Sequence, residues 1–203
     1  MKINFELDEY KMTNKQYISK IISEECIEYA DGYFFGKLPG TRYSSQYYLS
    51  RALYNIDFLN CVAEEFYKKI EKEVGHFEFQ IAGQEFSSIP LLISLPIILE
   101  KKYGIKLNSF MIKNERKSYG IHNFIEGCTV DLPVLIVGEM CNSTNTFLHC
   151  HNVLKYHKFD MLPYIFAVLN KYGSKFSSGK LEDRYLKKDF KPLTILNRDD
   201  LKT

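Results

Sequence analysis

Short apolar segments that alternate with longer helical segments constrain the fold of this chain more than any other feature of its sequence. Strands separated by helical stretches of ten or more residues are typical of a mainly parallel sheet covered by helices on both faces. We therefore predict an α/β fold. The expected strands are 77–82, 107–113, 134–137 and 164–169, and the expected helices between them are 88–102 and 146–156.

The N-terminal part shows two further helical signals. Thr13 followed by Gln16 forms a capping-box pattern that predicts the start of a helix. Apolar residues recur at every fourth position from Phe58 to Val74 and predict a long amphipathic helix. Glycine and proline punctuate 33–46, which favours a loop-rich hairpin, and 47–53 is expected as a strand.

Composition limits the classes of protein to consider. The 203 residues carry 27 Lys and Arg against 25 Asp and Glu, so a surface organised around nucleic acid is not expected. The five cysteines are scattered, and no apolar run is long enough for a membrane span, which predicts a protein of the cytosol. We expect one domain with three parts, a helix and small hood at about 1–50, a core at 51–172 and a tail at 173–203.

Unusual residues follow three of the expected strands, where an open parallel sheet binds its ligands. Gly83 ends the first strand before a helix, which suits a close approach to an anion. Lys113, Arg116 and Lys117 place three cations after the second strand. Glu139 and a polar run up to residue 146 follow the third. Each feature alone also fits an ordinary turn, a solvated loop or a helix cap.

Together and in this order, these segments resemble the type I phosphoribosyltransferases, most closely the orotate phosphoribosyltransferase branch. The turn at 81–90 is similar to the family's first diphosphate-binding turn, and 110–127 resembles its flexible loop and following hairpin. The segment 134–146 takes the place of the motif that binds phosphoribosyl diphosphate (PRPP). The segment 35–48 is similar to the hood that contacts the base. The resemblance covers about 15–170.

The resemblance implies transfer of ribose 5-phosphate from PRPP to a nucleobase, with an orotate-like pyrimidine expected, Mg²⁺ on the diphosphate and a cytoplasmic homodimer. It implies no metal ligand from the protein itself. The catalytic residues that it implies are Lys117, Lys113 and Glu139. The residues implied for PRPP and phosphate are Gly83, Gln84, Asn142, Ser143, Thr144, Asn145 and Thr146. The residues implied for the base are Lys37, Arg42 and Tyr47.

The sequence also departs from the family pattern. Gly138 stands where the first of two adjacent acids is usual, and Asn142 and Thr144 stand where threonine and glycine are usual. Asn114 takes the place of a lysine in the loop. An alternative hypothesis follows, in which the chain is a catalytically impaired relative that binds nucleotides or phosphosugars and serves a regulatory role.

Two other kinds of site are disfavoured. On the expected helix, His149 and His151 lie about 200° apart, and Cys150 and His157 are about 10 Å apart along the axis, so no shared metal ion is expected. Cys141 lies at a helix start without a recognisable histidine partner, which disfavours a cysteine nucleophile.

Overall fold

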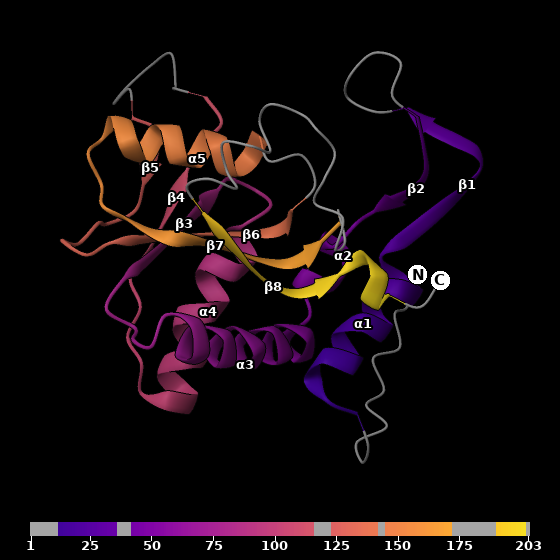
Figure 1. Ribbon diagram of the computed structural model, residues 1–203, viewed down its shortest axis with the longest axis horizontal. Coiled ribbons are helices and arrows are strands. Elements are labelled where there is room, and N and C mark those ends of the chain that lie inside the picture. The colour runs from indigo at the N-terminus through magenta and orange to yellow at the C-terminus, as the bar shows by residue number, and fades with distance from the viewer. Residues whose placement is uncertain (1–11, 36–41, 116–122, 142–144, 172–189, 202–203) are drawn as a thin grey trace.

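The structure is a computed structural model that describes residues 12–35, 42–115, 123–141, 145–171 and 190–201. A six-stranded sheet with the order β5-β4-β3-β6-β7-β8 forms its centre, with helices on both faces (Figure 1). All its strands run parallel except β5, which is antiparallel to β4, so the expected α/β fold is confirmed. The sheet strands are β3 (Gln80–Gln84), β4 (Ser109–Ile112), β5 (Ile125–Glu126), β6 (Val134–Cys141), β7 (Met161–Asn170) and β8 (Lys191–Asn197). The helices are α1 (Asn14–Glu25), α2 (Ser50–Leu53), α3 (Ile56–Glu73), α4 (Ile89–Tyr103), α5 (Asn145–Tyr156) and the short 3₁₀ helix η1 (Arg198–Asp200).

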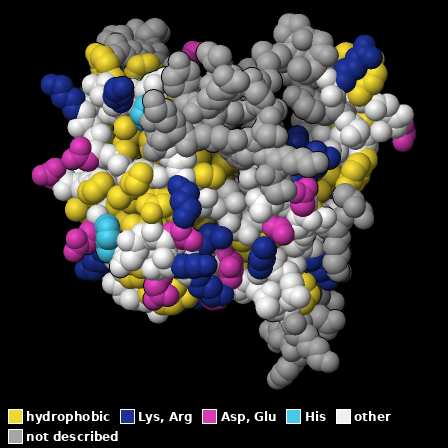
Figure 2. All heavy atoms as spheres, in the orientation of Figure 1, with side chains coloured by type: hydrophobic (Ala, Val, Ile, Leu, Met, Phe, Trp, Pro, Cys, Tyr) yellow, Lys and Arg dark blue, Asp and Glu magenta, His cyan; other side chains and the backbone are white. Residues whose placement is uncertain are grey.

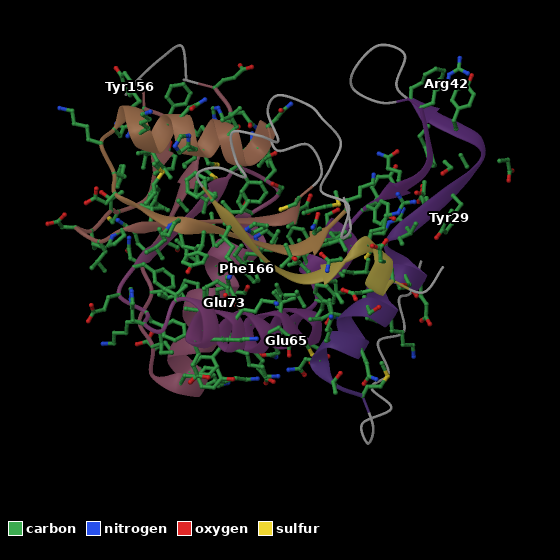
Figure 3. All side chains as sticks on the ribbon, viewed as in Figure 1. Tyr29, Arg42, Glu65, Glu73, Tyr156 and Phe166 are labelled. Carbon is green, nitrogen blue, oxygen red and sulfur yellow. The ribbon has the colours of Figure 1, made fainter. Side chains whose placement is uncertain are left out.

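One face of the sheet is covered by α1, α3 and α4. The predicted capping box is present, because Thr13 and Gln16 bond to each other's backbone at the start of α1. The fourfold periodicity of α3 buries Phe58, Val62 and Phe66 completely, and the ring of Phe66 meets that of Phe166 on β7 edge to face. Figure 3 shows Phe166 pointing from the sheet toward this helical layer. The larger hydrophobic core therefore lies on this side.

The opposite face is covered by α5. A second core cluster lies between this helix and the sheet, and Phe147 and Cys150 of α5 pack there with Ile136 of β6 and Ala167 of β7. In Figure 1 α5 lies above the sheet and α3 below it. The two layers bury β6 from both sides, which explains its run of buried residues from Val134 to Gly138.

A two-stranded antiparallel hairpin stands beside this body and corresponds to the expected hood. It consists of β1 (Ile27–Phe35) and β2 (Arg42–Tyr47). Figure 1 shows it on the same side as α1, α2 and the end of β8. The expectation of a strand at 47–53 is wrong, because β2 ends at Tyr47 and Ser50 to Leu53 form α2, which buries Ala52 and Leu53.

The C-terminal region is more than the expected tail. Residues 191–197 form β8, which pairs in parallel with β7 and buries Leu193, Ile195 and Leu196. Its sequence was not recognised as a strand because the pattern is short and holds Pro192, which suits an edge strand. The core of the fold therefore includes this last strand.

The surface is mixed in charge. Figure 2 shows lysine and arginine interspersed with aspartate and glutamate over α3, in keeping with the near balance of charges in the sequence. Within the described ranges, no helix combines the length and the apolar character that crossing a membrane requires. The cytosolic location stays a prediction.

Candidate functional site

The carboxyl ends of β3, β6 and β7 lie next to one another, because these strands are parallel neighbours in the sheet. The turns that follow β3 and β6 lead into α4 and α5, so both helices begin at this edge. It is the edge at which open parallel sheets bind ligands. The residues that the sequence singled out there can now be located one by one.

Gly83 brings the turn after β3 against β6. A Cβ atom at this position would lie 2.5 Å from the Cβ of Ser88 and 2.6 Å from the carbonyl oxygen of Val137. Only glycine fits here, and the Ser88 hydroxyl uses the space to donate to that same Val137 oxygen at 3.1 Å. The glycine thus fixes the start of α4 against the end of β6.

The start of α4 has no side-chain cap. Ser88 occupies the N-cap position, but its hydroxyl is bonded to Val137 and makes no capping hydrogen bond. Phe86, just before it, adopts a left-handed conformation with φ of 63° and exposes three quarters of its surface. Such strain in a non-glycine residue often marks a functional turn. Pro90 in the first turn of α4 has no N–H, but the N–H groups of Ile89 and Leu91 have no side-chain cap, which suits an anion.

Gln84 and Lys113 have partners within the protein. The amide of Gln84 bonds to that of Asn114, and the N–H of Asn114 donates to the Glu85 carboxylate at 2.9 Å. Lys113 is only 5% exposed, and its ammonium forms an ion pair with Glu126 of β5. This directs the Lys113 ammonium toward β5, the outer strand of the sheet. Its catalytic role stays a prediction, as does that of Gln84 in phosphate binding.

The end of β6 carries a second glycine that is required for space. A Cβ atom on Gly138 would lie 2.9 Å from the ring atom Cζ of Phe147, and that ring is 1% exposed. Phe147 belongs to the first turn of α5, so Gly138 lets this helix approach the strand. The sequence analysis noted Gly138 only as the position where the family usually has an acid, and it did not identify Phe147 as a residue that shapes the site.

Glu139 follows directly and is largely buried. Burial raises the pKa of its carboxyl group to about 7, and no described residue gives it a hydrogen bond or an ion pair. Burial raises the pKa of the Cys26 thiol to about 11, and the nearby charge of Glu139 adds to this rise, which places the carboxylate on the side of α1. A half-protonated carboxyl group near neutral pH can accept from, or donate to, a sugar hydroxyl.

The start of α5 presents two of the expected phosphate residues. Asn145 is exposed and Thr146 is partly exposed in the first turn of the helix, at the same edge as Glu139. Asn142, Ser143 and Thr144 lie outside the described residues. The helix end and its polar side chains suit a phosphate group, and the phosphate-binding role of Asn145 and Thr146 stays a prediction.

The residues expected to contact the base are separated. Arg42 lies near the far end of the hood, where its guanidinium stacks 4.1 Å above the ring of Tyr33 (Figure 3). Tyr47 lies at the base of the hood, against the sheet edge, and the ammonium of Lys171 stands 4.6 Å above its ring. The structure therefore brings Tyr47 to the edge and places Arg42 away from it. Lys37 and Lys117 lie outside the described residues.

Lys171 is a candidate that sequence reasoning missed. It directly follows β7, its backbone N–H donates to Cys141 at 3.0 Å, and burial lowers the pKa of its ammonium. A half-buried cation at the carboxyl end of a central strand is well placed for an acidic ligand. Its position two residues after the predicted strand 164–169 was the available signal.

Other features of the molecule do not compete with this edge. A cavity of about 680 Å³ lies between α1 and the end of β8, where Lys15 pairs with Asp200 and Ser19 donates to the Asp200 backbone. Two of its charged groups, Lys15 and Asp200, therefore already have partners within the protein. Among the described side chains, no three His, Cys, Asp or Glu residues are placed to hold a metal ion. Burial raises the pKa of the Cys141 thiol to about 12, which disfavours a thiolate.

Comparison with known proteins identifies the fold. No model of a known protein family matches the chain, and no curated protein matches its sequence. Solved structures do match. A phosphoribosyltransferase from Corynebacterium diphtheriae has a TM-score of 0.72 at 16% identity, over 94% of this chain and 99% of that one.

Two further structures show the breadth of this similarity. Orotate phosphoribosyltransferase from Mycobacterium tuberculosis has a TM-score of 0.71 at 14% identity, over 94% of this chain and 99% of that one. Adenine phosphoribosyltransferase from Leishmania donovani has a TM-score of 0.57 at 12% identity, over 91% of this chain and 81% of that one. The chain has the type I phosphoribosyltransferase fold, which supports the resemblance stated from its sequence.

Proposed function

We propose that the chain is a phosphoribosyltransferase, which transfers the 5-phosphoribosyl group of PRPP to a nucleobase nitrogen and releases diphosphate. The observation that carries this proposal is the convergence of two helix starts, α4 and α5, at the edge where Glu139 lies. Gly83 and Gly138 make this convergence possible. Two anion-binding helix ends around one carboxyl group suit a ligand with a phosphate at each end of a sugar.

Each part of the edge has a proposed role. The uncapped start of α4 and the backbone at Gly83 hold the diphosphate, and the start of α5 with Thr146 holds the 5′-phosphate. Glu139 bonds to the ribose hydroxyls. The reaction develops positive charge on the sugar and negative charge on the leaving diphosphate, so correct placement of both supplies most of the catalysis. Lys117 would neutralise the leaving group from outside the described residues.

The base is proposed to be acidic, as orotate is. Lys171 supplies a half-buried ammonium at the end of β7, and the Tyr47 ring lies against it. A ring that stacks on Tyr47 could bring a carboxylate to this ammonium. The solved structures with this fold include both orotate and adenine phosphoribosyltransferases, so the fold itself leaves the base open.

Release of diphosphate from PRPP with orotate, uracil, adenine or hypoxanthine tests the proposal. Turnover should be highest with orotate, and Lys171→Met should raise KM for orotate about tenfold or more, by loss of a charge-assisted hydrogen bond. Lys191→Met is the matched control, because Lys191 is exposed and pairs with Glu73 on the surface. Silence with all four bases would contradict the proposed activity.

A second function is favoured by two observations. Lys113 is bound to Glu126 rather than presented at the edge, and Gly138 leaves one acid where the resemblance expects two. The chain would then bind a nucleotide or phosphosugar without turnover. Calorimetry with PRPP and with uridine and adenosine monophosphates separates the two functions, since binding without diphosphate release is the result that the second one requires.

A homodimer is also proposed. Residues 89–99 of α4 are apolar on nearly all sides, yet Ile93 and Ile97 are 58% and 60% exposed, and the exposed Phe86 precedes this helix. A helix apolar all round is normally covered. Sedimentation should show a dimer that Ile93→Glu dissociates, while Ile56→Glu, the same change at an isoleucine of α3 that is 61% exposed, leaves it intact. A wild-type chain that sediments as a monomer would contradict this.

A further inference from the structure

One peptide group at the end of β4 is held from two sides. The carbonyl oxygen of Lys113 accepts from the ring Nε2–H of His149 at 2.8 Å, and the N–H of Asn114 donates to the Glu85 carboxylate at 2.9 Å. Both atoms belong to the peptide bond between residues 113 and 114. The oxygen and the hydrogen of a trans peptide point in opposite directions, so His149 and Glu85 hold the group from opposite sides.

The two partners come from segments that belong to different helices. His149 lies in the second turn of α5, whereas Glu85 lies in the turn between β3 and α4. In the sheet, β3 stands between β4 and β6, so α5, which follows β6, reaches across β3 to contact the end of β4. The 113–114 peptide therefore connects α5 with the turn that leads into α4.

Further contacts limit the movement of this peptide. The N–H of Lys113 donates to the carbonyl of Phe124 at 2.8 Å, and the Phe124 ring meets the His149 imidazole edge to face, with ring centroids 6.0 Å apart. On the other side, the side-chain amide of Gln84 bonds to that of Asn114. Hydrogen bonds that share one peptide group also reinforce each other, because each one polarises the group for the next.

We propose that His149 and Glu85 are positioning residues of the candidate site. Through the 113–114 peptide they keep the start of α4 and the start of α5 at the spacing that a ligand with a phosphate at each end requires. The inference rests on the proposed function for the identity of that ligand, and neither side chain needs to touch it. Binding of both ends at once depends on this spacing, because an end that meets a site already in place loses little further freedom.

The first test measures the bridge in the ligand-free protein by amide hydrogen exchange. His149→Leu removes the donor and should raise the exchange rate of the Asn114 N–H about tenfold or more. The effect should cross the bridge to the Glu85 N–H, which donates to Ile112 at 2.8 Å. His149→Gln keeps a side-chain N–H donor and should restore slow exchange. Faster exchange that does not reach the Glu85 N–H would overturn the inference.

His151→Leu is the matched control on the same helix. Two residues along a helix, the His151 side chain points about 200° away from that of His149. Its ring contacts Phe190 edge to face and not the end of β4. Exchange at Asn114 and Glu85 should therefore stay within about twofold of wild type. An equal increase in both leucine variants would indicate general loosening of α5 and would contradict the bridge.

The second test separates the spacing of the two ends from each end alone. Under the proposed function, diphosphate occupies the α4 end, ribose 5-phosphate occupies the α5 end, and PRPP occupies both. Calorimetry should show that His149→Leu weakens PRPP binding about tenfold or more and changes the affinity for each fragment by less than about twofold. His149→Gln should restore the affinity for PRPP. Equal losses for PRPP and for a fragment would assign His149 a local structural role and overturn the inference.

The other side of the bridge is tested by two changes at Glu85. Glu85→Ala and Glu85→Gln both remove the charge, but only glutamine keeps an acceptor for the Asn114 N–H. The alanine variant should therefore bind PRPP about tenfold more weakly than the glutamine variant, with similar affinities for the fragments. Equal PRPP affinities in the two variants would contradict the role of Glu85. If wild type binds neither PRPP nor a fragment, the proposed function fails, and hydrogen exchange alone decides whether the bridge exists.

Discussion

At the end of β3 and at the end of β6, a glycine lets the following helix approach the strand, but different side chains fill the space. Ser88 of the α4 start lies against Gly83 and donates to a backbone carbonyl, whereas the Phe147 ring of α5 lies against Gly138. The next residue is Gln84 on β3, with an amide partner, and Glu139 on β6, without a described partner.

The difference separates a structural turn from a reactive one. The β3 end satisfies its polar groups internally and leaves only the backbone of α4 for a ligand. The β6 end keeps an apolar ring on one face and an unsatisfied carboxyl group on the other. Buried polar groups without partners are costly, and they are retained mainly where a ligand supplies the partner.

Among the substitutions at these two strand ends, Gly83→Ala should lower the free energy of unfolding the most. The new methyl group would meet the Val137 carbonyl at 2.6 Å as well as Ser88, and backbone atoms cannot turn aside. We expect a loss of about 3 kcal/mol in the free energy of unfolding, measured by urea denaturation. Gly32→Ala is the matched control, because nothing lies within 4 Å of the position and its stability should stay within about 0.5 kcal/mol. Equal losses in both variants would contradict this account.

Glu139→Gln makes the β6 end resemble the β3 end, where glycine is followed by glutamine. The folded carboxyl group has a pKa of about 7, above its ordinary value, so between about pH 4.5 and 7 folding takes up a proton. Wild-type stability should therefore be full below this range and fall by roughly 3 kcal/mol as pH rises through it.

The Gln variant should lack that fall and be the more stable chain at pH 8. Urea denaturation at pH 5 and pH 8 measures it, with Glu78→Gln as the control at an exposed carboxylate. Parallel pH profiles for wild type and Glu139→Gln would contradict the assignment of an unpartnered carboxyl group to this edge.

Gly138→Ala should lower the free energy of unfolding by less than Gly83→Ala. The new methyl group of Gly138→Ala would meet the tip of the Phe147 side chain and not a backbone atom. We expect a loss of about 1.5 kcal/mol from the overlap with Phe147. Phe147→Leu should relieve part of it, so a double-mutant cycle should show a favourable coupling of about 1 kcal/mol. Additive losses would mean that the two residues do not share the space.

Ser88→Ala should have the smallest effect on the free energy of unfolding. It removes one buried hydrogen bond to the Val137 carbonyl, at an expected cost of about 1 kcal/mol. Because Ser88 does not cap α4, the helix itself should keep its circular dichroism signal. Ser87→Ala, one residue earlier in the same turn, is the control. A loss of helicity would show that Ser88 acts as a cap.

The sequence predicted the elements whose signals are local. The capping box of Thr13 and Gln16 and the fourfold periodicity of α3 depend on residues close in the chain, and both predictions are confirmed. The strand expected at 47–53 is wrong, because burial of Ala52 and Leu53 against other helices selects a helical turn there. β8 was missed because its pairing with β7 is a tertiary contact.

The candidate site was predictable as a location and not as an arrangement. The turns after β3 and β6 follow from strand order and glycine positions. The direction of Lys113 toward Glu126 and the distance of Arg42 from Tyr47 depend on packing between distant segments. The same holds for Phe147, whose ring meets Gly138 across a loop and a helix turn.

The contact between Phe147 and Gly138 also has an evolutionary consequence. An acid introduced at position 138 by mutation would meet the ring and destabilise the chain, and a smaller residue at 147 that arises first would leave a cavity. Each single step is harmful, although the two together are compatible. We therefore expect substitutions at the two positions to be coupled, because the side chain at each position restricts what the other can accept.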